Sequence, residues 1–350
     1  MQNFRYSILV TILCLGLASF WGYHSNGVSG IWPALSIVAI LGIMEVSLSF
    51  DNAVVNASVL KEMDAKWRQI FLTIGILVAV FGMRLLFPIL IVSVATGQGM
   101  IDVARMALNQ PEVYSEHLHA NHTGIAAFGG TFLFMVFLSF LFDEGKELHW
   151  LGIIEKKLAQ LGKADSIGII VTLLVLMGLY KYLPIDDDQK GTMFLAGVGG
   201  LMLYIIVDSF GSFFETEEEE AIVQTAKRSG IMGFVYLEIL DASFSFDGVI
   251  GAFAVTRDVV IIMLGLAIGA MFIRSLTVYL VNKGTLDEYV FLEHGAHYAI
   301  GILAAIMFYS IYTEVPEIVT GLVGMAFIVA AVVSSIIYKK SHPKLDEKGI

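Results

Sequence analysis

The sequence predicts an all-α polytopic membrane protein with about ten transmembrane helices, which include two inverted three-helix repeats. Three observations lead to this fold class. The chain of 350 residues is 57% hydrophobic and only 15% charged, long apolar stretches recur along it, and one acidic motif occurs twice inside those stretches. A soluble chain of this length could not cover so much apolar surface with polar side chains.

Ten apolar stretches of the chain are long enough to cross a bilayer core about 30 Å thick, which takes about 20 residues of helix. They cover residues 5–22, 33–60, 69–96, 124–142, 166–183, 192–209, 230–256, 259–281, 296–313 and 317–338. The first stretch has no small-x-small cleavage site at Ser19, Phe20 and Trp21. We therefore expect a retained span there rather than a signal peptide.

Lysines and arginines indicate the orientation, because they concentrate in cytoplasmic loops. Outside the spans, most of these residues fall on one side of the expected topology. The exceptions are Arg105, Lys181, Lys190 and Arg257. We therefore expect a protein of the inner cell membrane whose N- and C-termini are both cytoplasmic.

The acidic motif defines the repeat. Leu41–Asn56 reads LGIMEVSLSFDNAVVN, and the stretch from Leu237 reads LEILDASFSFDG. Aligned without gaps, the copies are identical at Leu41/Leu237, Ile43/Ile239, Ser47/Ser243, Ser49/Ser245, Phe50/Phe246 and Asp51/Asp247, with Glu45 opposite Asp241. An odd number of expected crossings separates the copies, so they enter the bilayer from opposite sides and the repeat is inverted.

These features divide the chain into consecutive parts. Residues 1–32 form an N-terminal membrane helix and loop, 33–145 the first repeat, 146–229 a cytoplasmic amphipathic segment with two membrane helices and an acidic loop, 230–316 the second repeat, and 317–350 a C-terminal membrane helix and cytoplasmic tail. The amphipathic segment has apolar residues at helical spacing, which suits a helix on the membrane surface or against a partner helix. They are Leu148, Leu151, Ile154, Leu158 and Leu161. The acidic run Glu217–Glu220 is either a solvated linker or a metal-recruiting or regulatory patch.

Acids inside a membrane are costly and therefore mark candidate functional sites. In a straight helix Glu45 and Asp51 point about 120° apart. Either the helix is distorted near Ser47 to Ser49, or each acid meets a different partner. Facing one another, the two motifs would form a nest of oxygen donors with these candidate metal ligands: Glu45, Ser49, Asp51, Asn52, Glu238, Asp241, Ser245 and Asp247. Such hard donors suit manganese, magnesium or calcium, and the single cysteine, Cys14, cannot form a thiolate cage.

Two arginines are candidate counter-charges. Arg84 follows Gly75, and Arg274 follows Gly265, by nine residues within a span. Carboxylates crowded in a medium of low dielectric take up protons when a cation leaves, which would couple metal and proton movement. The competing interpretation is that a buried acid–arginine pair only locks two helices together.

Histidines form two further candidate groups. His294 and His297, beside Glu293 in the stretch FLEHGAHYAIG, are candidate proton relays, ligands or helix-cap residues. The second group lies in a polar loop that either collects metal or carries histidines without a binding role. It comprises Glu112, Glu116, His117, His119 and His122.

The E-x-S-x-S-x-D-N pattern at Glu45–Asn52, the acids of the second copy and the FLEHGAHYAIG stretch resemble the TerC family of integral membrane proteins, most closely its branch labelled as a domain of unknown function. The resemblance covers roughly residues 35–335. It implies inverted three-helix units and an association with manganese export and tellurium resistance. The site residues that it carries over are Glu45, Asp51, Asn52, Asp241 and Asp247. At position 248 the family pattern leads us to expect a second asparagine, but this sequence has a glycine there.

We therefore expect a secondary transporter that exports a divalent cation, manganese first, in exchange for protons through a midplane carboxylate site. We expect no enzyme activity and no permanently bound cofactor. The expected partners are the cation, protons and the lipid bilayer, but not nucleic acid, because the chain has no basic stripe. Gly265 and Gly269 are a small-residue pair that packs helices within one chain or between copies in a homo-oligomer.

Two other functions compete with transport. A non-transporting scaffold in a metal or tellurium stress-response complex would use the cytoplasmic segments 143–165 and 208–229. An intramembrane aspartyl protease would also place two aspartates on neighbouring helices. That activity requires a Tyr-Asp and a Gly-x-Gly-Asp pair, which the sequence lacks.

Overall fold

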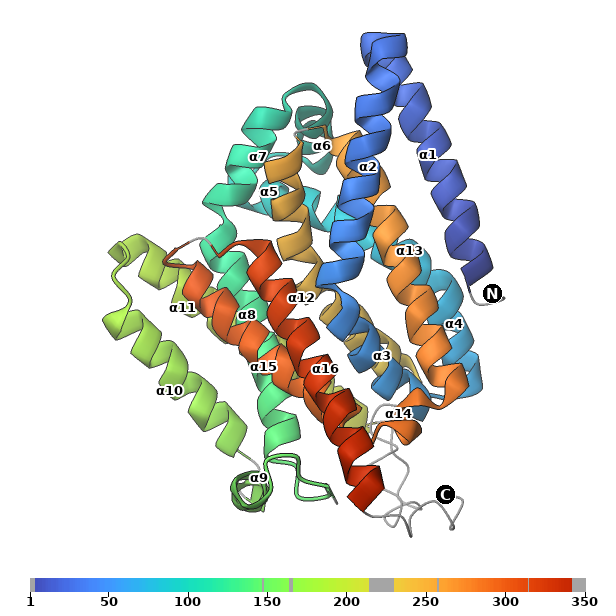
Figure 1. Cartoon of the computed structure of the whole chain (residues 1–350). Coiled ribbons are helices and arrows are strands. Elements are labelled where there is room, and N and C mark those ends of the chain that lie inside the picture. Colours follow the sequence, from blue (N-terminus) through green and yellow to red (C-terminus); the bar gives the residue numbers. More distant parts are fainter. Residues whose placement is uncertain are drawn as a thin grey trace.

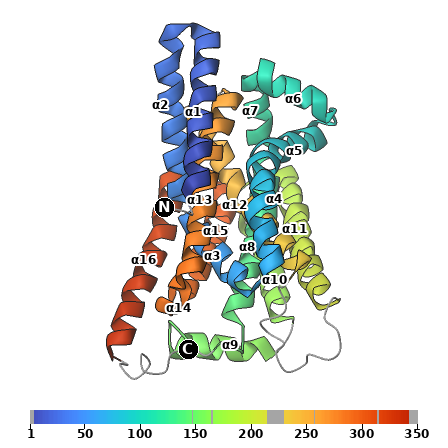
Figure 2. The same cartoon turned by 90° about the vertical axis from the view of Figure 1, so that its right-hand side faces the viewer.

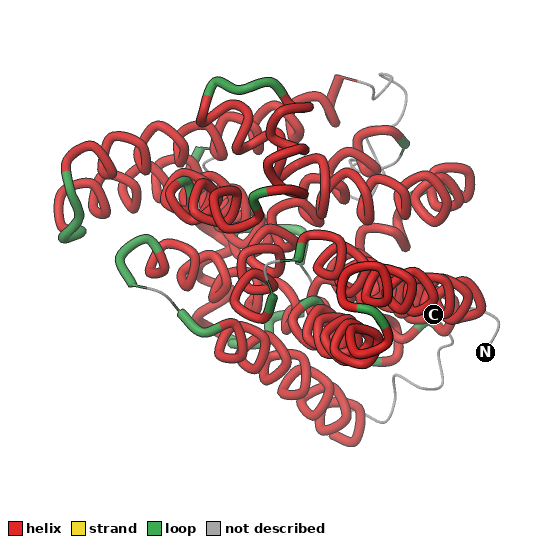
Figure 3. The backbone as a smooth tube through the Cα atoms, turned by 90° about the horizontal axis from the view of Figure 1, so that it is seen from above, coloured by secondary structure: helices red, strands yellow, loops and turns green. Residues whose placement is uncertain are grey.

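The structure, a computed structural model, describes residues 4–146, 148–163, 166–213, 230–256, 258–313 and 315–341. Throughout these ranges the chain forms helices and turns without a β-strand, as Figures 1 and 3 show. The first helices are α1 (Arg5–Asn26), α2 (Val28–Leu48), α3 (Phe50–Glu62), α4 (Ala65–Leu77), the π-helix η2 (Val78–Leu86), α5 (Phe87–Thr96), α6 (Met100–Asn109), α7 (Pro111–Ala120) and α8 (His122–Leu141). They are followed by α9 (Ile153–Ala159), the 3₁₀-helix η3 (Gln160–Lys163), α10 (Ile167–Tyr182), α11 (Asp187–Phe213), α12 (Ile231–Val255), α13 (Val259–Lys283), α14 (Thr285–Glu288), α15 (Leu292–Ser310) and α16 (Glu317–Ser341). The all-α prediction is confirmed.

Within the described ranges, six helices are long and apolar enough to cross a membrane, namely α1, α2, α8, α11, α13 and α16. A seventh is added if α9–η3 and α10, which meet at 102°, form one broken span. The chain is therefore a polytopic membrane protein. Each of the ten expected spans coincides with a helix or a run of helices, but length and composition alone support six or seven of them.

The other expected spans are more polar or are interrupted. The span expected at 69–96 is divided into α4, η2 and α5, and α15 begins with Glu293 and two histidines. The helix α12 carries Glu238, Asp241 and Asp247 along its length. Of these polar residues Glu238, Asp241, His294 and His297 are buried, so other helices rather than lipid cover them.

The first copy of the acidic motif breaks its helix, whereas the second copy does not. The helix α2 ends at Leu48, and α3 begins at Phe50. Ser49 between them has φ −103° and ψ 17°. The structure has the distortion that the sequence allows near Ser47 to Ser49, whereas the partner of the Asp51 side chain lies outside the described part. The second copy lies within the continuous helix α12.

The helices of the two expected repeats pack reciprocally. In the first unit α2 packs on α13, in the second unit α12 packs on η2, and the third helices α8 and α15 pack on each other. In Figure 1 the chain descends through α2 and α3 and ascends through α12, so the two copies of the motif run in opposite directions. This exchange of partners is the packing that two inverted units would have.

The N-terminal helices form a hairpin that is fastened to α13. Trp21 Nε1 donates to Asp258 Oδ2 at 2.7 Å, and Ser7 Oγ donates to the Met271 carbonyl at 2.7 Å. Figure 2 shows the α1–α2 hairpin projecting at the end of the bundle opposite α9. The helix α2 begins at Val28, ahead of the expected start at residue 33, and Pro33 lies inside it.

The glycine pair of α13 packs within the chain. A Cβ added at Gly265 would lie 2.5 Å from Leu41 Cβ, and one added at Gly269 would lie 2.4 Å from Glu45 Cβ. Both glycines therefore let α13 approach α2 closely. This pair is an intrachain contact and gives no support for a homo-oligomer.

Two segments differ from what the sequence leads us to expect. The polar loop before residue 124 contains the helices α6 and α7. The helix of the amphipathic segment begins only at Ile153, after Gly152 with a positive φ of 60°, so Leu148 and Leu151 lie outside it. Glu217–Glu220 lies outside the described residues.

Candidate functional site

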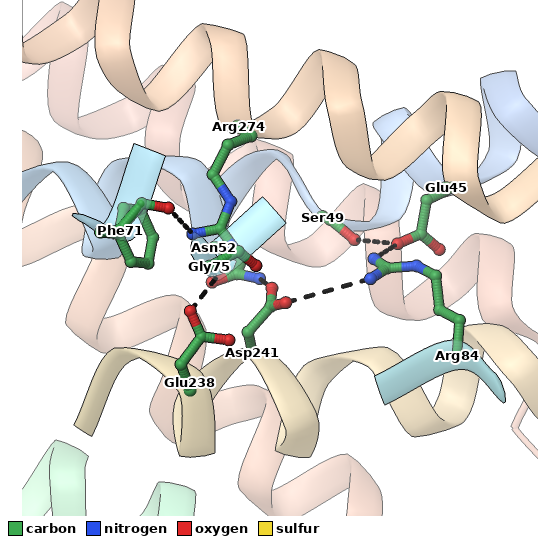
Figure 4. A network of polar contacts seen from close by, with 9 residues as sticks. All are labelled: Glu45, Ser49, Asn52, Phe71, Gly75, Arg84, Glu238, Asp241 and Arg274. Atoms are coloured by element: carbon green, nitrogen blue, oxygen red, sulfur yellow. Dashed lines mark hydrogen bonds and ion pairs between the residues drawn. The ribbon is translucent and has the colours of Figure 1, made fainter. Parts of the chain in front are cut away.

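The two copies of the acidic motif meet in a buried network of carboxylates and arginines between α2, α3, η2, α12 and α13 (Figure 4). Each of its five charged residues is at most 6% exposed: Glu45, Arg84, Glu238, Asp241 and Arg274. Buried charges persist only where they are paired or bind an ion. The network is therefore built from ion pairs and hydrogen bonds.

Arg84 lies between an acid of each copy. Its Nη2 donates to Glu45 Oε1, and its Nη1 lies 3.9 Å from Asp241 Oδ2. Ser49 Oγ donates to the same Glu45 oxygen at 3.4 Å. The break at Ser49 thus occurs where the chain supplies Glu45 with a second donor.

Asn52 joins the two copies directly. Its Nδ2, on α3, donates to Asp241 Oδ1, on α12, at 3.0 Å. The other oxygen of Asp241, Oδ2, has no hydrogen-bond partner among the described residues. Asp241 therefore keeps one acceptor oxygen that faces Arg84 but is not hydrogen-bonded to it.

Arg274 forms the second ion pair. Its Nη2 lies 3.6 Å from Glu238 Oε1 and donates to the Gly75 carbonyl at 2.8 Å. Its Nη1 donates to the Phe71 carbonyl at 3.3 Å, and its Cζ lies 3.8 Å from the centre of the Phe71 ring. Neither Glu238 oxygen has a hydrogen bond within the described part of the chain. Arg274 is thus held mainly by α4, and Glu238 only by charge.

Arg84 lies in a π-helix. The segment η2 continues α4 and leads into α5. A π-helix widens the backbone and rotates the side chains that follow, and such segments occur frequently at functional sites. Here the widened turn directs Arg84 toward Glu45 and Asp241 instead of toward the outside of the bundle.

Glycines make room for the acids. A Cβ at Gly75 would lie 2.6 Å from Glu238 Oε1, and a Cβ at Gly248 would lie 2.9 Å from Glu45 Oε2. The glycine at 248, where we expected an asparagine, therefore admits the Glu45 carboxylate against α12. A larger residue there would have to displace it.

Three predicted ligands are not described at the side-chain level. The backbones of Asp51, Ser245 and Asp247 belong to α3 and α12, but their side chains lie outside the described part of the structure. The predicted ligands that the structure does bring together are Glu45, Ser49, Asn52, Glu238 and Asp241. Among the described side chains, no group of three or more His, Cys, Asp or Glu residues is arranged to hold a metal ion.

Residues 50–342 match the family model described as "Protein of unknown function (DUF475)". The chain belongs to this family. No curated protein and no solved structure matches the chain. The matched range includes Asn52, Arg84, Glu238, Asp241 and Arg274 but begins after Glu45. Nearly all of the described network thus lies within the part of the chain that defines the family.

The candidate relay histidines of this family member lie in a different cluster. His294 Nε2 lies 3.0 Å from the Leu148 carbonyl oxygen and 3.5 Å from Glu155 Oε1. The ring of His297 stacks on Phe140 with a centroid distance of 4.1 Å. These contacts tie the start of α15 to α8 and to the segment that follows it. The relay role stays a prediction.

The loop histidines also lie apart from the network. His117 and His119 are in the last turn of α7, and His122 begins α8. No metal-holding group of three or more ligands includes them within the described residues.

The carbonyls of Phe71 and Gly75 are the members of the network that the sequence did not indicate. The only hint was the glycine itself, because backbone acceptors carry no residue signature.

Proposed function

We propose that this protein is a secondary transporter that exports a divalent cation, manganese first, in exchange for protons. The observation that carries the proposal is the chain of contacts from Glu45 through Arg84 and Asp241 to Asn52, which joins both copies of the acidic motif inside the bundle. A pair that only locked two helices would not need acids from both copies. An intramembrane ionisable cluster is by default a candidate transport site.

The charge balance supports a cation. The described network contains three acids and two arginines, which leaves one negative charge in excess when all are ionised. Asp51 and Asp247 add two more acids to the same helices. A divalent cation would offset two of these three negative charges, and protons would do so in its absence.

Arg84 gives the exchange a physical basis. Its guanidinium is a fixed cation that neutralises Glu45. It also faces Asp241 Oδ2, which accepts no hydrogen bond among the described residues. A divalent ion binding between these carboxylates would displace it, and the ion's departure would let Arg84 and protons return. The carboxylate, hydroxyl and amide oxygens of Glu45, Asp241, Ser49 and Asn52 are the donors that manganese accepts.

The resemblance to the TerC family supports manganese among the divalent ions. On the orientation that lysine and arginine favour, export runs from the end of the bundle that carries α9 and α14 to the end that carries α6 and α7. The inner cell membrane and cytoplasmic termini belong to the same proposal.

Proton flux in proteoliposomes tests the proposal. We expect an outward manganese gradient to drive proton movement across vesicles that contain the full chain, and Asp241→Asn to abolish it. The matched control is Asp188→Asn, because Asp188 is an exposed acid outside the network. Size-exclusion profiles and melting temperatures check that both variants fold. Flux that survives in both Asp241→Asn and Glu45→Gln would refute the proposal. An inactive wild type would favour the scaffold.

A further inference from the structure

The segment between α8 and α10 lies across one end of the bundle. It contains α9 and η3, and Figure 2 shows α9 running crosswise to the long helices. The axis of Ile153–Gly162 makes an angle of 102° with that of α10. A helix in this position lies in the plane of the membrane surface if α10 crosses the membrane.

A polar contact holds this segment to the protein. Glu155 is completely buried and accepts hydrogen bonds from Lys146 Nζ at 2.7 Å and from the Leu151 amide at 3.0 Å. His294 Nε2, on α15, lies 3.5 Å from the same carboxylate. Lys146 Nζ lies 4.0 Å from the centre of the Phe140 ring. The face of α9 that points to the bundle is therefore centred on an acid, not on leucines.

Three large apolar side chains of α9 and η3 point away from the bundle. Ile153 is 75% exposed, Ile154 65% and Leu161 50%. With 100° per residue, Ile153 and Ile154 lie on the side of α9 opposite or beside Glu155. An amphipathic helix of a soluble protein does the reverse and buries its apolar stripe. Within the described part of the chain, nothing covers these side chains.

Lipid is the cover that the surroundings favour. The next helix, α10, exposes Ile170, Leu174 and Met177, so α9 and η3 adjoin a helix whose exposed surface is also apolar, as that of a membrane span would be. Lys156 and Lys157 are exposed on the same side of α9. Apolar side chains with lysines beside them are typical of helices that rest in the headgroup region of an anionic leaflet.

We propose that residues 150–163 are an anchor that binds the anionic lipid surface at this end of the bundle. Ile153, Ile154 and Leu161 enter the boundary between headgroups and acyl chains, and Lys156 and Lys157 contact headgroup phosphates. The buried Glu155 ties the anchor to α15. The inference does not depend on transport and holds whether or not the network carries a cation.

An environment-sensitive fluorophore tests the anchor. Every labelled variant also carries Cys14→Ala, because Cys14 is the single cysteine of the chain and would otherwise react with the fluorophore. The fluorophore is attached at Ile154→Cys or Leu161→Cys in the full chain in nanodiscs, and at Glu144→Cys, an exposed position before the segment, as the control. We expect blue-shifted emission and quenching by spin-labelled lipid at 154 and 161, and water-like emission at 144.

Lipid charge provides the second arm. In discs that contain phosphatidylglycerol, the blue shift at 154 should exceed that in discs of phosphatidylcholine alone, and Lys156→Gln with Lys157→Gln should remove the difference. Water-like emission at both 154 and 161 would overturn the proposal. Protection from aqueous and lipid quenchers alike would also overturn it, because the cover would then be a second protein surface.

Discussion

Arg84 is the side chain on which the two copies of the motif converge. It is charged at any accessible pH, it contacts an acid of each copy, and it is buried. Removing one partner of a buried ion pair leaves an uncompensated charge at a cost of about 3–5 kcal/mol. The fate of that charge distinguishes a structural pair from a binding site, because a binding site can fill the vacancy with an ion.

We predict that Arg84→Met makes the protein depend on a divalent cation for stability. Without Arg84, Glu45 and Asp241 repel each other, and manganese at about 100 times its dissociation constant would restore about 2.7 kcal/mol. Melting temperatures with and without manganese measure this. The shift should be larger in Arg84→Met than in the wild type, and Arg84→Lys, which keeps the charge, should resemble the wild type. An equal shift in all three proteins would indicate that Arg84 does not occupy the ion's place.

Gly75 offers a second test at the scale of one residue. A Cβ there would meet Glu238 Oε1 at 2.6 Å and Arg274 Nη1 at 3.0 Å. Forcing atoms into a packed interior costs about 1–3 kcal/mol, so Gly75→Ala should lower the melting temperature. Gly178 in α10 is the control, because a Cβ there meets nothing within 4 Å. Gly178→Ala should leave stability unchanged or raise it slightly. Equal melting of the two variants would contradict the packing seen around Glu238.

Part of the network could be predicted from residue types alone. Acids, serines and an asparagine in a duplicated pattern identify Glu45, Asn52 and Asp241 as residues that meet, because charge inside a membrane needs a partner. The pairing of Arg274 with the Phe71 and Gly75 carbonyls could not be predicted. Every residue has a carbonyl, so nothing in the sequence distinguishes the one that accepts.

At the scale of elements, the sequence predicts that a helix is interrupted better than it predicts the geometry of the interruption. The serines of the first motif indicate a distortion, and α2 indeed ends at Leu48. The identical serine spacing in the second copy lies in the unbroken α12. Local sequence is therefore not sufficient, and the difference must come from what packs against each copy. The π-helix η2 was not predicted, since a widened turn does not change hydrophobic composition.

The α9 segment shows the same limit. Leucine spacing predicts a longer helix that includes Leu148 and Leu151, but Gly152 with φ of 60° lies before the helix start. The spacing indicates an apolar face of the helix but not the polar contact that holds the helix to the bundle. The buried contact is Glu155 instead, because Lys146 and His294 approach it from α8's end and from α15. Partners distant in sequence decided which face is inside.

We predict that acid weakens this contact. Burial lowers the pKa of His294, and the charges of Lys146 and His149 lower it further. The Leu148 carbonyl and the charge of Glu155 raise this pKa, but the net shift is downward. Burial raises the pKa of Glu155, but the hydrogen bonds from Lys146 and the Leu151 amide, with the charges of Lys146 and His294, outweigh burial and leave that pKa lowered. Both groups therefore bind protons less readily in the folded protein, so the contact loses stability as pH falls, first through His294 below the ordinary histidine pKa of 6.5.

Melting temperatures from about pH 7.5 to about pH 5.5 check this sign. The wild type should lose more stability over the interval than His294→Gln, which can still donate to the Leu148 carbonyl but does not titrate. The difference between the two proteins isolates His294 from the other acids and histidines. A wild type that loses no more stability than the variant would show that His294 does not sense pH.

At the scale of the whole molecule, composition and loop charge carry most of the prediction. Lipid offers no hydrogen-bond partners to backbone N–H and C=O groups, so an apolar segment that crosses the membrane has to pair these groups within a helix. A chain with many such segments is therefore helical and polytopic. Hydropathy alone does not give the count of spans, because α12 and α15 owe their place inside the bundle to packing. Orientation is set by the membrane and the cell.

The topology makes the last prediction. The helix α8 is long and apolar enough to cross the membrane, so its two flanks should lie on opposite sides. The distribution of lysine and arginine predicts that the α9 side is cytoplasmic. In a Cys14→Ala background, Glu116→Cys on α7 should react with an impermeant maleimide in intact cells, and Glu144→Cys after α8 should react only once the membrane is opened. Both positions are exposed, so burial does not mask either label. The opposite pattern would reverse the direction of transport without altering the network, whereas labelling of both positions from outside would mean that α8 does not span the membrane.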